Sequence, residues 1–177
     1  MSVDASNNIN LELLASCIDG TYTINDDGSI DVDGNVELGH RNLTKIPFKF
    51  LHIHGSFYCY NNRLTSLEGA PINVGGDFWC NRNRLTSLDR APNTVGDSFS
   101  CSDNQLTSLE GAPNFVGDTF WCCFNLNLPY SELFKIVDRV KGIYYSSMDT
   151  TEDKDKIRRD RDVKNVLKDN DLGNLDV

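Results

Sequence analysis

Cysteine is the residue type in this sequence with the widest range of chemistry, and four of its six copies recur at a fixed spacing. They lie 21 residues apart, at Cys59, Cys80, Cys101 and Cys122. Thiolates bind metals and attack electrophiles, but zinc sites usually pair cysteines separated by only about two to four residues. Each of these cysteines follows a Phe by two positions, which in a strand puts both side chains on one side. We therefore expect reduced thiols that pack in the core as small apolar groups.

Histidines and acidic runs are weaker candidates for a metal or catalytic site. His52 and His54 would share one side of an extended segment, but no third ligand follows at a zinc-site spacing. The runs at 25–28 (NDDG) and 31–34 (DVDG) resemble calcium-binding loops, yet neither fits the register of an EF-hand. No catalytic triad, phosphate-binding loop or dinucleotide motif is visible. We therefore expect no enzyme activity, no metal and no cofactor.

The elements that position these residues come from a repeat of 21 residues. Residues 57–77, 78–98 and 99–119 are near-copies, residues 36–56 form a degenerate first copy, and residues 120–129 begin another. F-x-C predicts a short strand, and the Asn that follows it can bond the backbone of adjacent coils. Ala-Pro keeps the far side extended, and Gly turns the chain into the next strand. One coil cannot bury its own apolar side, so the repeat predicts a stacked solenoid.

The repeat resembles that of the leucine-rich-repeat family. The family pattern L-x-L-x-x-N-x-L is matched by FWCNRNRL at 78–85, with Phe and Cys replacing two leucines, whereas the first copy has Arg41 instead of Asn. More narrowly, LTSLEGAP followed by VGGDFxC resembles repeats of bacteriophage proteins and of some bacterial ones. The resemblance covers residues 21–129 and implies a curved stack. In this family a parallel sheet lines the concave face, which usually binds the partner.

Both ends of the stack should carry caps, because a terminal coil otherwise exposes its core. Residues 1–35 are predicted to form an acidic cap, with a helix over 8–19 that ends at Gly20 and a hairpin turning at 25–28. Residues 36–129 hold the repeats. Residues 130–177 are predicted to begin with a capping helix from Ser131 to Gly142 and to end in a charged tail. The expected fold class is α/β: a short leucine-rich-repeat solenoid with a helix and hairpin at one end and a helical segment at the other.

The net charge of −9 is concentrated near the N-terminus, where residues 1–40 carry eight acidic side chains and no Lys or Arg. Because no basic stripe compensates for it elsewhere, we expect no nucleic-acid partner. The first twenty residues lack the basic and apolar regions of a signal peptide. No stretch approaches the roughly 18 apolar residues of a membrane span. We therefore expect a cytoplasmic protein without membrane contacts.

The outward side of the F-x-C strands is the remaining candidate site. Tyr and Trp anchor many protein interfaces, and leaving them in water is costly unless something covers them. Packing of these aromatic groups under the C-terminal segment is the alternative interpretation. Cys123 is also expected to face outward. The predicted partner-binding residues are Glu37, Tyr58, Tyr60, Trp79, Asn81, Arg82, Ser100 and Trp121.

These expectations favour a non-catalytic protein-binding module. The resemblance to phage repeats implies a host protein as the partner and its inhibition as the effect, with an antiviral defence component as one example. In that case the chain would act in the cytoplasm of the host cell. The alternative is a structural or assembly protein that self-associates through residues 146–177, where mixed charges leave only a thin apolar stripe.

Overall fold

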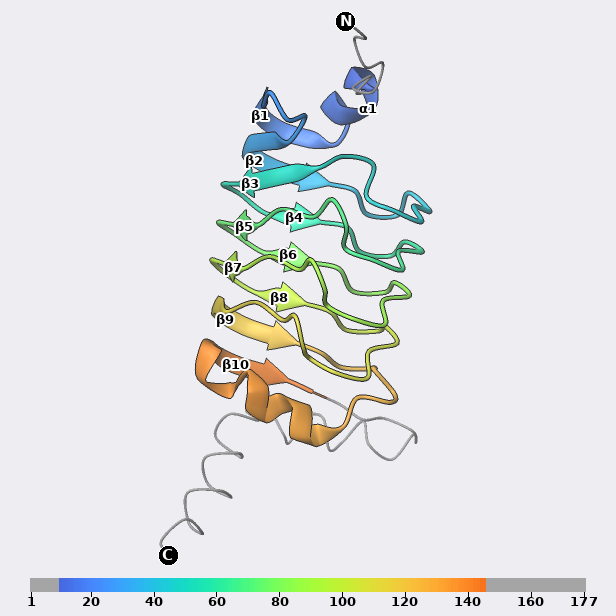
Figure 1. Cartoon of the computed structure of the whole chain (residues 1–177), viewed down its shortest axis with the longest axis vertical. Helices are drawn as coiled ribbons and strands as arrows, with labels where there is room; N and C mark the ends of the chain where they lie inside the picture. Colours follow the sequence, from blue (N-terminus) through green and yellow to red (C-terminus); the bar gives the residue numbers. More distant parts are fainter. Residues whose placement is uncertain (1–9, 146–177) are drawn as a thin grey trace, which may run out of the picture.

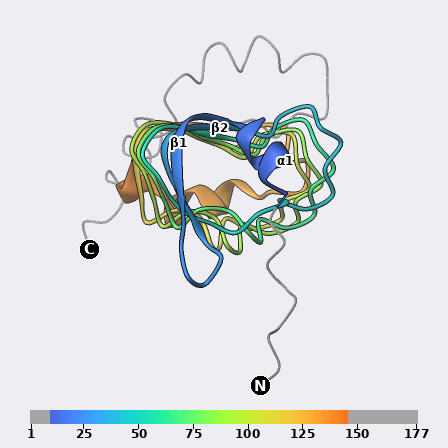
Figure 2. The ribbon, with the colours of Figure 1, turned by 90° about the horizontal axis from the view of Figure 1, so that it is seen from above.

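A computed structural model describes residues 10–145, which form a β-solenoid of stacked coils (Figure 1). Viewed down the stack, the coils superimpose into one flattened loop (Figure 2). In chain order the elements are α1 (Leu11–Ala15), β1 (Ile18–Ile24), β2 (Ile30–Glu37), β3 (Phe50–Ile53), β4 (Phe57–Tyr58), β5 (Asn73–Val74), β6 (Phe78–Trp79), β7 (Thr94–Val95), β8 (Phe99–Ser100), β9 (Phe115–Trp121), the 3-10 helices η1 (Tyr130–Lys135) and η2 (Val137–Arg139), and β10 (Val140–Tyr144).

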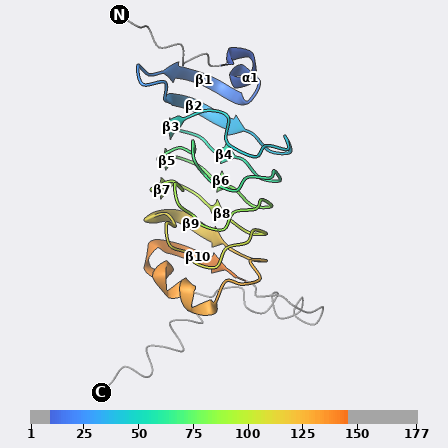
Figure 3. The ribbon, with the colours of Figure 1, turned by 45° about the vertical axis from the view of Figure 1, so that its right-hand side comes forward.

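Two parallel ladders of short strands run along the stack. The first joins the end of β2 to β4, β6, β8, the end of β9 and β10. The second joins the start of β2 to β3, β5, β7 and the start of β9. One repeat makes one coil, so residues 57–77, 78–98 and 99–119 are coils two, three and four, and coil five begins at Phe120. The predicted solenoid and its parallel sheet are confirmed, although the stack curves little in Figures 1 and 3.

The F-x-C strands build the core, as their alternation predicts. The rings of Phe57, Phe78 and Phe99 stack with centroids 5.4 Å apart at each step, and Phe120 continues the stack at 4.9 Å. All four rings are fully buried. Each ring contacts the equivalent ring of the next coil, so the column of phenylalanines holds the coils in register.

An asparagine three residues after each ladder cysteine ties neighbouring coils together. The Nδ2 of Asn104 donates to the carbonyls of Cys80 in the preceding coil and of Cys101 in its own, each at 3.1 Å. Its Oδ1 accepts the Leu85 N–H at 2.9 Å. These bonds satisfy backbone groups that the buried corner of the coil leaves unpaired. The predicted ladder is confirmed, since the same bonds recur at Asn62, Asn83 and Asn125.

The N-terminal end is closed by a hairpin and one helical turn. β1 pairs antiparallel with β2, from Ile18 opposite Val36 to Ile24 opposite Ile30. The hairpin is thus confirmed, but β2 crosses the predicted boundary at 35 and joins both ladders. Asn10 caps α1 by accepting the Leu13 N–H at 3.0 Å.

The predicted helix over 8–19 is wrong in extent, because the described helix covers only Leu11–Ala15 and Gly20 lies inside β1. Gly20 faces Gly34 across the hairpin, with φ angles of +141° and +144°. A Cβ on either glycine would collide with the backbone of the opposite strand. This pair lets β1 bend with β2 around a corner of the coil, so Gly20 extends the strand instead of ending a helix.

The C-terminal end is also closed by a strand, and the predicted helix from Ser131 to Gly142 is wrong. Two short 3-10 helices, η1 and η2, lead into β10, which pairs in parallel with β9. Ile143 and Tyr144 stand beside Phe120 and Trp121 in this pairing. The apolar residues whose spacing favoured a helix therefore lie in 3-10 turns and in the strand that follows them. This strand adds a final partial coil to the stack.

Glu132 fastens this C-terminal segment to coil four. Its Oε2 accepts hydrogen bonds from Ser108 Oγ at 2.7 Å and from the Leu109 N–H at 2.9 Å. The ammonium of Lys135 lies 2.9 Å from the same oxygen. The hydrogen bond from Lys135, followed by those from Leu109 and Ser108, lowers the pKa of the Glu132 carboxyl.

A carboxyl whose pKa is lowered by folding contributes stability above its unfolded pKa and loses it as pH falls through the folded pKa. We expect Glu132→Gln to lower Tm at pH 7 by about 2–4 °C. The difference from wild type should shrink as the pH falls below the ordinary carboxyl value of 4.5. Thermal unfolding followed by circular dichroism at several pH values would test this, and a difference independent of pH would contradict it.

Candidate functional site

The first ladder carries one outward side chain per coil, on the side opposite the phenylalanine stack. Trp79 and Trp121 in this row remain 39% and 37% exposed, which is high for indole rings. The second outward position of coils two to four carries Tyr60, Asn81 and Ser102. Together with the row, these three residues form the aromatic face. The row consists of Glu37, Tyr58, Trp79, Ser100, Trp121 and Tyr144.

Three aromatic rings of coils two and three form one cluster on this face. The ring centroids of Tyr58 and Trp79 lie 5.1 Å apart, and Tyr60 packs against both at 6.4 and 6.2 Å. All three contacts are edge-to-face, and His40 adds a fourth against Tyr60 at 5.1 Å. The rings brace one another, so the cluster presents a rigid surface in place of freely rotating side chains.

A second cluster lies at the C-terminal end of the row. Trp121 stacks on Tyr144, with ring centroids 3.9 Å apart and planes 8° from parallel. Tyr144 was not among the predicted site residues, because the sequence analysis expected a capping helix that ends at Gly142 and no strand at this position. The signal was present in the sequence: Val140-x-x-Ile143-Tyr144 repeats the V-x-x-x-F-W of β9 with one residue fewer.

Coil four separates the two clusters, because Ser100 occupies the row position between Trp79 and Trp121. Cys123 was expected to face outward beside Ser102, but it is only 8% exposed. Its N–H donates to Ser102 Oγ at 3.1 Å, and burial raises the pKa of its thiol to about 11. The expectation failed because strand alternation ends at this position, where the chain turns the corner.

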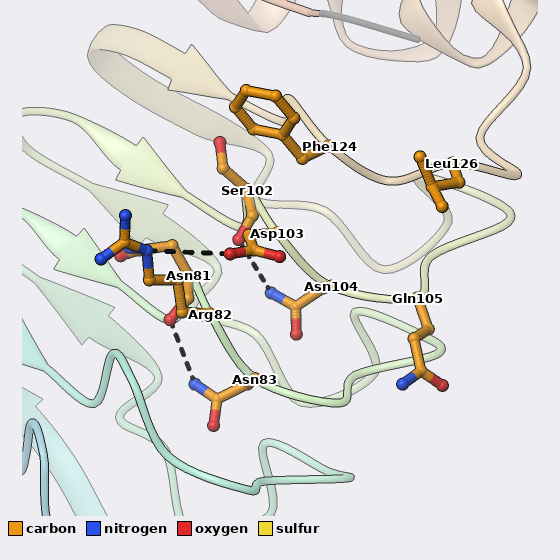
Figure 4. A pocket seen from close by; sticks show the side chains of 9 residues that line it. All are labelled: Asn81, Arg82, Asn83, Ser102, Asp103, Asn104, Gln105, Phe124 and Leu126. Carbon is orange, nitrogen blue, oxygen red and sulfur yellow. Dashed lines mark hydrogen bonds and ion pairs between the residues drawn. The ribbon is translucent and has the colours of Figure 1, made fainter. Parts of the chain in front are cut away.

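An open groove of about 750 Å³ follows at that corner (Figure 4). Coil three lines it with residues 81–83, coil four with residues 102–105, and coil five with the exposed side chains of Phe124 and Leu126. The corner residues Arg82, Asp103 and Phe124 adopt φ angles of +55° to +58°, a left-handed turn repeated in each coil. This groove continues the aromatic face past the ends of the strands, and sequence reasoning missed its coil-five wall.

Two polar features mark the groove. The Arg82 Nε lies 3.7 Å from the Asp103 carboxylate, and both side chains are exposed. The Oδ1 of Asn81 is buried and has no hydrogen-bond partner among residues 10–145. Burying an acceptor oxygen without a donor costs about 1–3 kcal/mol. Because this oxygen is buried, a donor from a bound molecule would satisfy it only after the Asn81 amide turns toward the groove.

The structure brings the predicted site residues together along this face. Glu37 stands at its N-terminal end, where its carboxylate accepts the Gly39 N–H at 2.6 Å. Arg82 stands at the groove rim, and Ser100 is half-buried at the centre of the row. Residues 146–177, for which self-association was predicted, lie outside the described residues.

His52 and His54, the two histidines considered as metal ligands, each contact a side chain of a neighbouring coil or strand. His52 Nδ1 lies 3.2 Å from Asn73 Nδ2, and His54 Nδ1 lies 3.6 Å from the Asp33 carboxylate. Across residues 10–145, no group of three His, Cys, Asp or Glu side chains could hold a metal ion. Over the same range, no helix is long and apolar enough to span a bilayer.

All six cysteines are free and buried, and burial raises the pKa of each thiol. Because the thiolate is the reactive form, we expect the native protein to react with a thiol reagent at least about a hundredfold more slowly than free cysteine does. All six thiols should react once the chain is unfolded in denaturant. Rapid labelling of the native protein, at Cys123 above all, would contradict this account.

The chain matches no protein-family model, no curated protein and no solved structure at a significant level. Its function must therefore be inferred from the geometry of the aromatic face and the adjoining groove. That geometry consists of fixed aromatic rings, a polar gap at coil four and an open corner.

Proposed function

We propose that this chain is a non-catalytic module that binds another protein through its aromatic face. The observation that carries the proposal is the row itself, in which Trp79 and Trp121 are 39% and 37% exposed among packed tyrosines. Trp and Tyr supply large contact areas at little cost in side-chain entropy, and they are enriched among the residues that dominate binding energy. The strands beneath hold these rings in place before any partner arrives.

The charges on this surface favour a protein partner over a nucleic acid. Glu37 lies at one end of the row, and Arg82 at the groove is already paired with Asp103. A nucleic-acid site needs clustered positive charge to neutralise phosphates. The chain instead carries a net charge of −9.

We propose further that the chain is a leucine-rich-repeat protein of phage origin, acting in the host cytoplasm. The 21-residue coils and their buried asparagine ladder support the first part. The likeness of LTSLEGAP and VGGDFxC to phage repeats supports the second. On this proposal the partner is a host protein, an antiviral defence component for example, and binding inhibits it.

Affinity capture from a bacterial lysate, followed by mass spectrometry, tests the proposal. Three tagged forms would be compared: wild type, the face variant Trp79→Ala/Trp121→Ala, and the matched control Tyr22→Ala/Phe115→Ala. The control removes two aromatic side chains that are 37% and 53% exposed elsewhere on the solenoid. We expect one host protein to be captured by wild type and control but not by the face variant. Capture of the host protein by all three forms would contradict the assignment of the aromatic face as the binding site. Recovery of copies of this chain without any host protein would favour self-association through residues 146–177.

A further inference from the structure

A gap interrupts the aromatic row at coil four. Ser100 stands in register between Trp79 and Trp121, so a small hydroxyl occupies a position that carries an indole on either side. Neighbouring strands in a sheet lie about 4.7–4.9 Å apart, which places the backbones that carry the two indoles about 9.5 Å apart. We call the space above Ser100, between the two indoles, the notch.

The notch has the width of one flat group stacked between two rings. On this face Trp121 stacks on the ring of the next coil, Tyr144, at 3.9 Å. In the core, rings on successive coils stack at 4.9 to 5.4 Å. A guest that stacked on Trp79 and on Trp121 at such distances would span the two-coil separation. The small side chain of Ser100 in coil four therefore leaves a space that one flat ring or group could fill.

The surroundings of the notch offer hydrogen-bond acceptors. Ser102 and Asp103 of coil four continue from it into the corner groove, where they lie beside Asn81 and Arg82 of coil three (Figure 4). The Asp103 carboxylate lies 3.7 Å from Arg82 Nε and keeps further acceptor sites, and the buried Oδ1 of Asn81 has no partner among residues 10–145. A guest suited to these groups is flat, donates hydrogen bonds and carries positive charge.

We propose that the partner inserts an arginine side chain into this notch. The guanidinium is planar, stacks on indole faces and presents five N–H donors in a fixed plane. A lysine ammonium is compact and does not stack in this way, and a tyrosine ring is neutral with a single donor. The net charge of −9, most of it in residues 1–40, also favours the approach of a cationic segment to the molecule as a whole. This inference rests on the proposed function, because it uses the same face.

Intrinsic fluorescence reports directly on this notch, because Trp79 and Trp121 are the two tryptophans of the chain. The probe is acetyl-Gly-Arg-Gly-amide, titrated into the full-length protein at constant ionic strength with excitation selective for tryptophan. The comparison peptides carry Lys or Tyr in place of Arg. We expect a saturable change with the arginine peptide at a Kd on the order of 1 mM, and binding at least about tenfold weaker with the other two.

Ser100→Phe tests the position, because it fills the notch with a ring while keeping both tryptophans. Coils two and three carry Tyr58 and Trp79 in the same row, so the fold should accept it. The response to the arginine peptide should be lost. Thr107→Phe is the matched control, since it adds the same ring to an exposed site of coil four at another corner, and its response should equal that of wild type. Asn81→Ala, which removes the unpartnered oxygen, should weaken the binding about tenfold.

Two results would overturn the inference: equal binding of the tyrosine or lysine peptide, or an unchanged response in both Ser100→Phe and Asn81→Ala. Its failure can be separated from that of the proposed function. If the arginine peptide gives no response while capture of the host protein still requires Trp79 and Trp121, only the inference fails. If capture is also independent of these tryptophans, both fail.

Discussion

Asn104→Ala is expected to lower the free energy of unfolding by about 3–5 kcal/mol, because it leaves several buried backbone groups without partners. The substitution removes the acceptor for the Leu85 N–H and the donor to the carbonyls of Cys80 and Cys101. These groups lie in the core, where water cannot replace the lost bonds. Asn104 also joins two coils, so its loss weakens a nearest-neighbour contact on which the stack depends.

Gln105→Ala is the matched control for this prediction. Gln105 is the next residue, has a similar side chain and is exposed, so its loss should change stability by less than about 0.5 kcal/mol. Urea unfolding followed by circular dichroism measures both variants. Equal stabilities for the two variants would mean that the asparagine ladder does not hold the coils together.

Trp79→Ala/Trp121→Ala is expected to weaken affinity for the captured partner by about a thousandfold. Truncation of an interface Trp that dominates binding costs about 2 kcal/mol or more, and each 1.4 kcal/mol is a factor of about ten in Kd. The thousandfold value takes the two losses as additive, which requires each indole to make contacts of its own with the partner besides those to a group between them. Isothermal titration calorimetry with the purified partner would measure the effect.

The stability of this variant should stay close to that of wild type, because both indoles are partly exposed and lie outside the phenylalanine stack. The variant Tyr22→Ala/Phe115→Ala should bind like wild type. Equal losses of affinity in the two double variants would show that the aromatic face has no special role. A large loss of stability in the Trp variant would show that these rings hold the fold instead of binding a partner.

The repeated part of the fold could be predicted from the sequence because each coil makes the same contacts. Phe78 and Phe99 stack, and Asn83 and Asn104 bond the neighbouring coil, since each has an equivalent residue 21 positions away. A single coil would have given an ambiguous pattern, but near-copies in register leave few ways to bury the apolar residues. The outward positions of the row in coils one to five were predicted from the same alternation along the strands.

The ends were harder to predict because they lack that redundancy. Leu133, Ile136 and Val140 recur at a spacing that fits a helix, and hydrophobic spacing over so short a segment cannot exclude 3-10 turns that lead into a strand. The outcome was decided by the open edge of β9, which β10 covers with Ile143 and Tyr144. At the other end, the paired bend at Gly20 and Gly34 depends on a contact across the hairpin, which a helical pattern does not reveal.

The candidate site was predicted along the strands and missed at the corner. Alternation placed Trp79 and Trp121 outward correctly, but it ceases where the chain enters a left-handed turn at Arg82, Asp103 and Phe124. That turn buries Cys123 and exposes Phe124, the reverse of what continued alternation implies. The groove exists only because three coils meet at this corner, a feature of the stack that one repeat does not contain.

Fluorine NMR of the chain labelled with 5-fluorotryptophan tests the central claim most directly, because Trp79 and Trp121 would give the two resonances and both lie on the aromatic face. Addition of the unlabelled partner should shift or broaden both resonances in proportion to complex formation, while Tyr22→Ala/Phe115→Ala protein behaves identically. Two resonances that stay unchanged in a fully formed complex would place the interface elsewhere and contradict the proposed function.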